Sequence, residues 1–261
     1  RDEGATWGEP VMCVMDEVGY YVMNNDRAIQ LAGGRLVLPL CLHWPEGQAK
    51  ADWQGTLMCY LSDDNGKSWR RGRTAHKTFD ATGRRVTTQE PGVVELKDGR
   101  LLAFGRGNTI EGHMPQSVSS DMGKTWTYSP SPFPPIGGGQ RLVLLRLREG
   151  PLLFISFANE NQVPVEIQDA AGNTRTIRGM YAALSRDDGA SWTVTRLISE
   201  GGPERESQTT NGEPFTLGPV SAEPRGYLSI CQGLDGVIHL ISSWNHYAFN
   251  LKWLETPMPA R

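Results

Sequence analysis

The sequence lacks long apolar runs, a clear excess of one charge and paired cysteine motifs. No stretch of its 261 residues approaches the roughly 18 consecutive apolar residues of a membrane-spanning helix, which excludes such a span. Lys and Arg total 26 against 29 Asp and Glu, so no basic surface for nucleic acid is indicated. The cysteines form no C-x-x-C pair, so we predict buried free thiols, with one disulfide as the alternative, and the histidines show no metal-ligand spacing, so we predict neither metal nor cofactor. The cysteines are Cys13, Cys41, Cys59 and Cys231.

Amphipathic helical patterns are also missing, whereas turn-forming residues are abundant. The 30 glycines and 17 prolines exceed the average share of roughly 12% for these two residue types. They are spread along the whole chain without a collagen-like period, so they mark turns between many short elements. The composition therefore favours an all-β fold.

One repeat has the pattern Ser-x-Asp-x-Gly-x-x-Trp. Three full copies lie at 62–69, 119–126 and 185–192, and a fourth at 1–7 lacks only its leading serine. We expect each copy to be a turn that is capped by its Asp and Gly, with its Trp packed into the sheet beyond. Because the copies recur along the whole chain, they indicate a fold signature and not a catalytic group.

A second repeat is a hairpin, in which two apolar, β-prone runs flank a glycine turn. Such runs around Asp-Gly or a related pair predict a hairpin. A third apolar run precedes the full Ser-x-Asp motifs, as at 56–61 and 180–184, and a fourth strand follows, as at 6–13. The hairpins lie at 31–38, 96–103, 147–154 and 234–240.

Four strands per repeat of about 60 residues are typical of one blade of a β-propeller. We expect a single domain over residues 1–261, made of antiparallel four-stranded blades. Full units lie near 20–80, 88–135 and 140–200, followed by a C-terminal piece with three strands at 226–254 and preceded by an N-terminal piece at 1–13.

The Ser-x-Asp-x-Gly-x-x-Trp turns resemble the Asp box of the sialidase superfamily, whose members are six-bladed propellers. Two arrangements fit the blade count. The favoured one is the last two-thirds of a six-bladed propeller, truncated at its N-terminus. In the other, residues 1–13 add a strand to the three C-terminal strands and close a four-bladed ring.

The hairpin glycines define a common level on the first strand of each blade, which lines the central channel of a propeller. Nine residues before each glycine stand Asn25, Glu90, Arg141 and Tyr227. Alternate side chains of a strand point to the same face, so these polar groups are expected at one level of the channel. Polar residues in otherwise apolar strands suggest a functional site.

Two segments resemble those that carry the sialidase site. Residues 89–106 are similar to the segment with the catalytic glutamate and the second carboxylate-binding arginine, which implies these roles for Glu90 and Arg106. Residues 226–231 are similar to the strand with the tyrosine nucleophile, which implies that role for Tyr227. For the third arginine Arg178 fits best, with Arg175 behind it and Arg141 as the inward-pointing competitor.

The resemblance is incomplete at the family's first arginine and at its acid aspartate. No Phe-Arg-Ile-Pro-like strand is present, and the run Asn24-Asn25-Asp26-Arg27 is only a loose echo of it. Arg27 lies two residues beyond Asn25 and can therefore face the channel. Asp26 and His43 are the candidate acids.

The resemblance implies a retaining exo-glycosidase, secreted or periplasmic, that releases a terminal sialic or related 2-keto sugar acid from a glycan. A phenol suits this substrate because its carboxylate beside the anomeric carbon would repel a carboxylate nucleophile. A neighbouring glutamate can take the phenol proton, and arginines can clamp the substrate carboxylate. The alternatives are a non-catalytic carbohydrate-binding propeller and, third, a lyase acting on an acidic polysaccharide.

Overall fold

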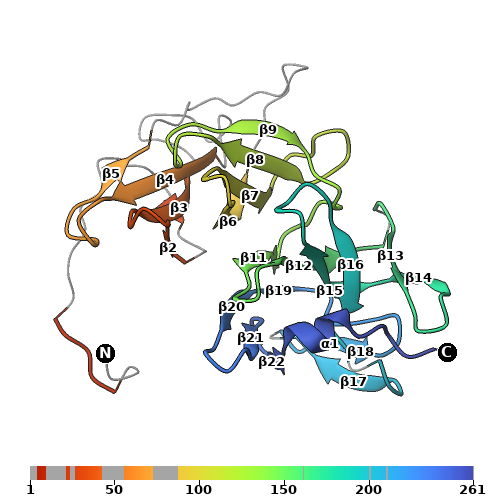
Figure 1. Ribbon diagram of the computed structural model, residues 1–261. Coiled ribbons are helices and arrows are strands. Elements are labelled where there is room, and N and C mark those ends of the chain that lie inside the picture. The colour runs from red at the N-terminus through yellow and green to blue at the C-terminus, as the bar shows by residue number, and fades with distance from the viewer. Residues whose placement is uncertain are drawn as a thin grey trace.

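The structure is a computed structural model, and it confirms the all-β propeller prediction. It describes residues 5–9, 22–23, 27–42, 56–72, 88–160, 162–199, 201–209 and 211–260. Within these residues the chain forms antiparallel sheets that are arranged as four blades of a propeller ring (Figure 1). The described part of the chain contains no helix with the length and apolar character of a membrane span.

The blades follow one another along the chain, and each blade is in contact with the next. The first blade contains β1 (Val22–Met23), β3 (Leu36–Leu42), β4 (Thr56–Ser62) and β5 (Arg70–Arg71), with β2 (Ile29–Gln30) also paired to β3. The second contains β6 (Gln89–Glu95), β7 (Leu101–Arg106), β8 (Pro115–Ser119) and β9 (Thr127–Pro130). The third contains β11 (Val143–Arg146), β12 (Leu152–Ala158), β15 (Gly179–Ser185) and β16 (Thr193–Leu197). The fourth contains β20 (Ser229–Gln232), β21 (Ile238–Ile241) and β22 (His246–Phe249).

The predicted hairpins connect the first two strands of each blade. In the second blade, the amide of Leu96 donates to the carbonyl of Arg100 at 2.7 Å, and the amide of Gly99 donates to the carbonyl of Leu96 at 3.0 Å. Gly99 has a φ of 82°, a conformation that glycine adopts without a steric penalty. The same bonds and the same left-handed glycine recur at Gly34, Gly150 and Gly236.

The Ser-x-Asp-x-Gly-x-x-Trp segments form the predicted turns at all three full copies. In the second copy the hydroxyl of Ser119 donates to Asp121 Oδ1 at 2.9 Å and accepts from the amide of Gly123 at 2.9 Å. The Asp121 carboxylate in turn accepts from the amide of Thr125 at 2.8 Å and from its hydroxyl at 2.7 Å. The other two copies repeat this network, and the three tryptophans are partly buried.

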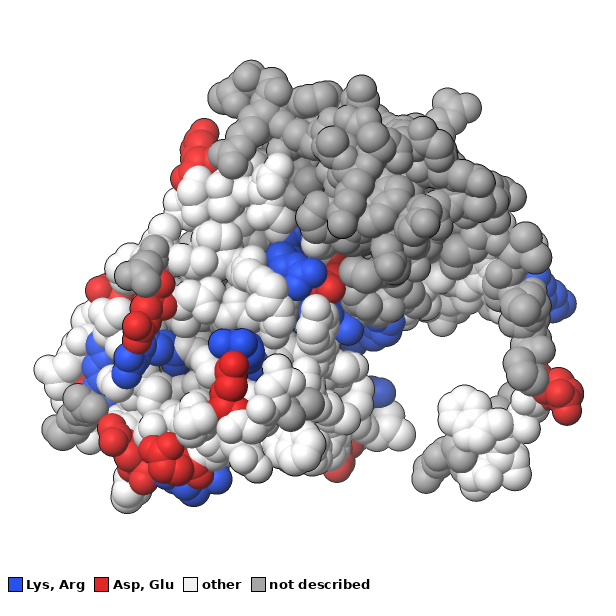
Figure 2. Space-filling view, turned by 180° about the vertical axis from the view of Figure 1, so that it is seen from behind, with Lys and Arg blue, Asp and Glu red and all other residues white. Residues whose placement is uncertain are grey.

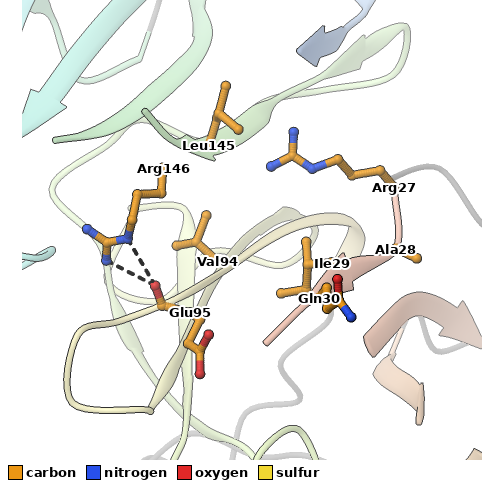
Figure 3. Close-up of a pocket in the computed structure, with 8 residues that line it drawn as sticks. All are labelled: Arg27, Ala28, Ile29, Gln30, Val94, Glu95, Leu145 and Arg146. Atoms are coloured by element: carbon orange, nitrogen blue, oxygen red, sulfur yellow. Dashed lines mark hydrogen bonds between the residues drawn. The ribbon is translucent and has the colours of Figure 1, made fainter. Parts of the chain in front are cut away.

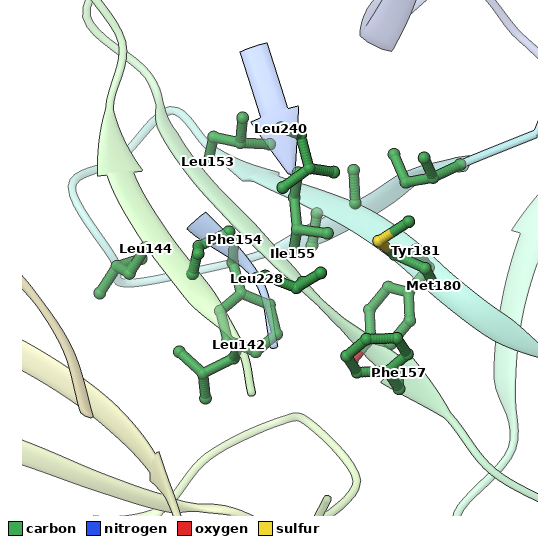
Figure 4. Close-up of a cluster of buried hydrophobic side chains, with 14 of the residues drawn as sticks. Leu142, Leu144, Leu153, Phe154, Ile155, Phe157, Met180, Tyr181, Leu228 and Leu240 are labelled. Atoms are coloured by element: carbon green, nitrogen blue, oxygen red, sulfur yellow. The ribbon is translucent and has the colours of Figure 1, made fainter. Parts of the chain in front are cut away.

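The largest core cluster lies in the third blade and joins it to its neighbours (Figure 4). Leu228 and Leu240, from the fourth blade, are fully buried in the same cluster as Phe154 and Ile155 of β12. Because the fourth blade contributes its inward-facing leucines to the core of the third, docking of the two blades and burial of their apolar faces are coupled.

Several details differ from the sequence predictions. A strand was expected over residues 6–13, but residues 5–9, which are the described part of this segment, form no strand, and Trp7 is 89% exposed. Among the described residues the fourth blade therefore has three strands. The last strand of the C-terminal piece ends at Phe249, because Asn250 caps the short helix α1 (Leu251–Glu255) by accepting from the amide of Trp253. Two hairpins were not predicted: β13 (Val165–Gln168) with β14 (Thr174–Ile177), and β17 (Arg205–Gln208) with β18 (Pro214–Leu217).

The cysteine prediction is right for one thiol and wrong for another. Cys59 and Cys231 are both free, and Cys59 is buried as expected. Cys231 is exposed, because it alternates with the buried Ile230 and so lies on the outer face of the fourth sheet. The thiols of Cys13 and Cys41 lie outside the described part of the chain.

Candidate active site

Glu90 is a buried carboxylate on a distorted strand. It lies near the start of β6, where the pairing with β7 shifts register between Gln89 and Gly92, and it is only 2% exposed. Its φ of 51° is in the left-handed region, which costs a non-glycine residue about 1–3 kcal/mol and is characteristic of functional sites. Gly105 of β7 permits the distortion, since a Cβ there would lie 2.4 Å from Thr88 Cγ2.

Arg106, at the end of β7, forms an ion pair with Glu90. Its Nη2 lies 3.1 Å from Glu90 Oε1, and the arginine side chain is 16% exposed. The same nitrogen donates to Gln89 Oε1 at 3.4 Å, while Nη1 donates to the carbonyls of Gly137 at 3.4 Å and Gln140 at 3.5 Å. The guanidinium is therefore held in one orientation and offsets the buried charge of Glu90.

Arg141 and Tyr227 lie side by side. The short strands β10 (Gln140–Arg141) and β19 (Gly226–Tyr227) pair in parallel, with Arg141 opposite Tyr227. Tyr227 is 42% exposed, and its amide donates to Ser243 Oγ at 2.9 Å. Because Arg106 binds the carbonyl of Gln140, the residue before Arg141, the Glu90–Arg106 pair and the Arg141–Tyr227 pair adjoin one another.

Arg178 lies beside this group, in the residue before β15. Its guanidinium pairs with Glu160 and is 57% exposed. It lines a pocket of about 270 Å³ together with Asn159 and Pro224. Both of these residues accept from Gln140 Nε2, at 2.6 and 2.8 Å, so the pocket adjoins the strand that carries Arg141.

Arg175, the alternative to Arg178, has a different environment. Its Nη2 donates to Asp169 Oδ2 at 2.5 Å and to the carbonyl of Pro259 at 2.8 Å, and its side chain is only 8% exposed. These bonds tie the β13–β14 hairpin to the C-terminal segment. Of the two arginines, Arg178 is the one that lines the pocket next to Gln140.

Arg27 lines a second pocket, of about 320 Å³, between the inner strands of three blades (Figure 3). Its Nη1 donates to the carbonyl of Ile230 at 3.3 Å, which links the first blade to the fourth. The pocket wall also contains Glu95 and Arg146, so this pocket lies at the end of β6 opposite to Glu90. Asn25, Asp26 and His43 lie outside the described residues, and the predicted acids therefore remain predictions.

Comparison with known proteins assigns the chain to a family. The model of the BNR repeat-like domain matches residues 1–240. The chain belongs to this family. No curated protein sequence matches it, but solved structures of sialidases are similar to it in fold.

Three solved structures illustrate the similarity. A protein of unknown function from Dyadobacter fermentans has a TM-score of 0.58 at 16% identity, covering 95% of this chain and 60% of that one. The intramolecular trans-sialidase from Ruminococcus gnavus in complex with oseltamivir carboxylate gives 0.51 at 19% identity, with coverages of 88% and 44%. The Trypanosoma rangeli sialidase with 2,3-difluorosialic acid, a covalent intermediate, gives 0.51 at 19% identity, with coverages of 94% and 34%. The chain thus spans 60% or less of the length of each, and these identities establish the fold alone.

One polar residue of this BNR propeller was missed by the sequence analysis. Glu223 is 1% exposed, and its carboxylate accepts from Ser242 Oγ at 2.8 Å and from the Tyr247 hydroxyl at 2.7 Å. It lies in the connection before β19, outside both sequence repeats, so no repeat could be used to predict which way its side chain faces. Its position four residues before Tyr227 is the only sequence signal that could have drawn attention to it.

The charges on the surface of the BNR propeller are mixed. Acidic and basic side chains are interspersed over the described part of the face in Figure 2. Among the described residues, no group of three or more His, Cys, Asp or Glu side chains is placed to hold a metal ion.

Proposed function

We propose that the chain carries the nucleophile side of a retaining exo-glycosidase site that releases a terminal 2-keto sugar acid. The observation that carries this proposal is the junction of two pairs, the buried Glu90–Arg106 ion pair and the Arg141–Tyr227 strand pairing. Membership of the BNR and sialidase propeller superfamily supports the same reading.

The arginines suit the recognition of a carboxylate. A guanidinium presents a planar fork of N–H donors that matches the two carboxylate oxygens. Arg106 is pre-oriented by its bonds to Glu90 and to two backbone carbonyls. Arg141 follows Gln140 in the chain, and Arg178 lines the pocket whose residues Asn159 and Pro224 accept from Gln140. Together they offer a positive site for the substrate carboxylate beside Tyr227.

Tyr227 acts as the nucleophile and Glu90 as its base. Glu90 accepts the phenol proton while the Tyr227 oxygen bonds to the anomeric carbon and the bond to the leaving oxygen breaks. That oxygen takes a proton from the acid, for which Asp26 and His43 are the candidates. A water molecule then attacks the anomeric carbon and gives a proton back to the acid, while the bond from that carbon to the Tyr227 oxygen breaks and this oxygen recovers its proton from Glu90. Two inversions at one carbon give net retention.

The test is release of the aryl alcohol from an aryl glycoside of a 2-keto sugar acid. An aryl leaving group needs little proton donation, so the assay reports mainly on the nucleophile side of the site. Tyr227→Phe should lower kcat/KM about a thousand-fold or more, because the group that forms the covalent bond is gone. Tyr181→Phe is the matched control, since it removes the same phenolic hydroxyl from a fully buried tyrosine, where that hydroxyl has no hydrogen-bond partner among the described residues.

Three other outcomes overturn the proposal. Saturable sugar binding without release identifies a carbohydrate-binding propeller. An unsaturated product detected by its ultraviolet absorbance identifies a lyase. Full activity of the Tyr227→Phe variant removes Tyr227 from the mechanism.

A further inference from the structure

The connection at residues 220–227 touches each part of the candidate site that lies in the third and fourth blades. The carbonyl of Val220 accepts from the amide of Arg178 at 2.9 Å, and the amide of Ala222 donates back to the Arg178 carbonyl at 3.0 Å. The carbonyl of Pro224 accepts from Gln140, and the segment ends at Tyr227 itself. A group that fixes this connection therefore fixes several site residues together.

Glu223 is the buried charge at the centre of this connection. Its carbonyl accepts from the amide of Met180 in β15 at 2.9 Å, which anchors the main chain to the third blade. Its carboxylate accepts from the hydroxyls of Ser242 and Tyr247, which anchors the side chain to the fourth blade. Burying an ionised carboxylate is costly, so its hydrogen bonds must offset a large desolvation penalty.

The Ser242 hydroxyl links Glu223 to the turn that binds the backbone of Tyr227. While it donates to Glu223, its oxygen accepts from the amides of Trp244 at 3.3 Å and Asn245 at 2.9 Å, which fixes the turn between β21 and β22. The next residue, Ser243, accepts from the Tyr227 amide through its Oγ. The turn therefore holds the backbone of Tyr227 in place.

The packing around Gly226 shows how close this approach is. A Cβ at Gly226 would lie 3.1 Å from Ser242 Cβ and 3.4 Å from Glu223 Oε1. The carboxylate, the turn and the strand that carries Tyr227 are thus in direct contact, with no room for a side chain between them.

We propose that Glu223 is a positioning residue that fixes Tyr227 for attack, through Ser242 and the 242–245 turn. The inference rests on the proposed function of Tyr227 as nucleophile. A carboxylate suits the role because both of its oxygens accept, and hydrogen bonds to an ionised acceptor are roughly twice as strong as neutral ones. An amide in its place would present an NH₂ group that cannot accept from Ser242 or Tyr247.

The test compares Glu223→Gln with wild type by two independent readouts. The first is amide hydrogen exchange of peptides covering residues 226–228 and 242–246, which should become at least tenfold faster, while exchange in β7 stays unchanged. The second is turnover of the aryl glycoside, for which kcat should fall at least tenfold while KM changes less than twofold, because Arg106 lies in the second blade, outside this connection.

Two further variants keep the test decisive. Ser242→Ala breaks the same link while Glu223 and its bond to Tyr247 remain, so it should reproduce both effects even if Glu223→Gln fails to fold. Glu166→Gln, at an exposed position of β13, makes the same chemical change away from the site and should alter neither readout.

The two proposals fail in different ways. Unchanged exchange at 226–228 overturns the link between Glu223 and Tyr227, whatever the activity. Faster exchange with wild-type kcat shows that Glu223 stabilises the fold without positioning the nucleophile. If wild type releases no aryl alcohol, the proposed function fails and the positioning role with it, while the exchange data still decide whether Glu223 holds Tyr227.

Discussion

At the scale of single residues, the Glu90–Arg106 pair combines a buried charge with a strained backbone. Glu90 is 2% exposed and its φ is 51°, so its backbone conformation and the burial of its carboxylate both depend on the surrounding structure. Arg106 forms an ion pair with this carboxylate. The Glu90–Arg106 ion pair therefore contributes both to the stability of the fold and to the proposed chemistry.

Replacement of Arg106 by Ala should destabilise the protein by about 3–5 kcal/mol, because it removes the guanidinium that forms an ion pair with the buried carboxylate of Glu90. Arg70→Ala is the matched control. Its partner Asp63 and Arg70 itself are both about half exposed, so the loss should stay within about 1 kcal/mol. Urea unfolding at pH 7 measures both values. Equal losses would show that the Glu90–Arg106 pair has no special weight.

The candidate site could be predicted from the sequence where a turn set the register, and not elsewhere. Glu90, Arg141 and Tyr227 were found by counting back from the hairpin glycines, and the structure places the last two opposite each other. Counting works because a glycine turn fixes which residues of the paired strands face one way. Glu223 was missed because its connection has no such turn and its partners lie about 20 residues further along the chain.

At the scale of elements, the Ser-x-Asp turns depend on ionised aspartates. The hydroxyl of Ser191, its amide and the hydroxyl of Ser185 donate to Asp187 and lower the pKa of Asp187 to about 2. The hydroxyl and amide of Ser68, together with Ser62, likewise lower the pKa of Asp64 to about 2. These bonds favour the charged form and hold the turn together.

The lowered pKa of Asp187 predicts an acid-dependent loss of stability. Its folded-state value of about 2 lies below the unfolded value of about 3.9, so the stabilisation is complete above pH 4 and is lost as the pH falls towards 2. Asp187→Asn should lower the urea midpoint at pH 6, and its difference from wild type should shrink as the pH approaches 2. A difference that stays constant over this range would contradict the role of the charge.

The elements were predictable where they repeat. The strands at 56–61 and 180–184 were expected from the apolar runs before the Ser-x-Asp motifs and are present as β4 and β15. The β13–β14 and β17–β18 hairpins occur once each, so no second copy revealed them. The helix α1 was missed because five residues are too few to show a helical period.

At the scale of the whole molecule, blade docking supports the proposed site. Leu228, the residue after Tyr227, is fully buried in the core cluster of the third blade. Because the Arg141–Tyr227 pairing bridges the same two blades, the apolar contact and the polar site share one interface.

The order of the blades along the chain was predictable from the repeats. The polar ties between blades were not, since they join residues far apart in the chain.

Leu228→Ala should therefore lower the free energy of unfolding by about 2–5 kcal/mol, the usual cost of removing a large apolar side chain from a core. Leu234→Ala is the matched control. Leu234 is 88% exposed in the β20–β21 turn, so its loss should change stability by less than about 0.5 kcal/mol. Urea unfolding followed by tryptophan fluorescence compares them, and similar effects would contradict the docking of the two blades through Leu228.

The most direct test of the central claim is to identify the residue that becomes bonded to the sugar. A 2,3-difluoro derivative of a 2-keto sugar acid is the probe, because a covalent intermediate of the Trypanosoma rangeli sialidase was obtained with such a compound. Peptide mass mapping should find the adduct on Tyr227 in wild type and in Tyr181→Phe, and no adduct in Tyr227→Phe. An adduct on another residue, or one that persists in Tyr227→Phe, would contradict the assignment of Tyr227 as the nucleophile.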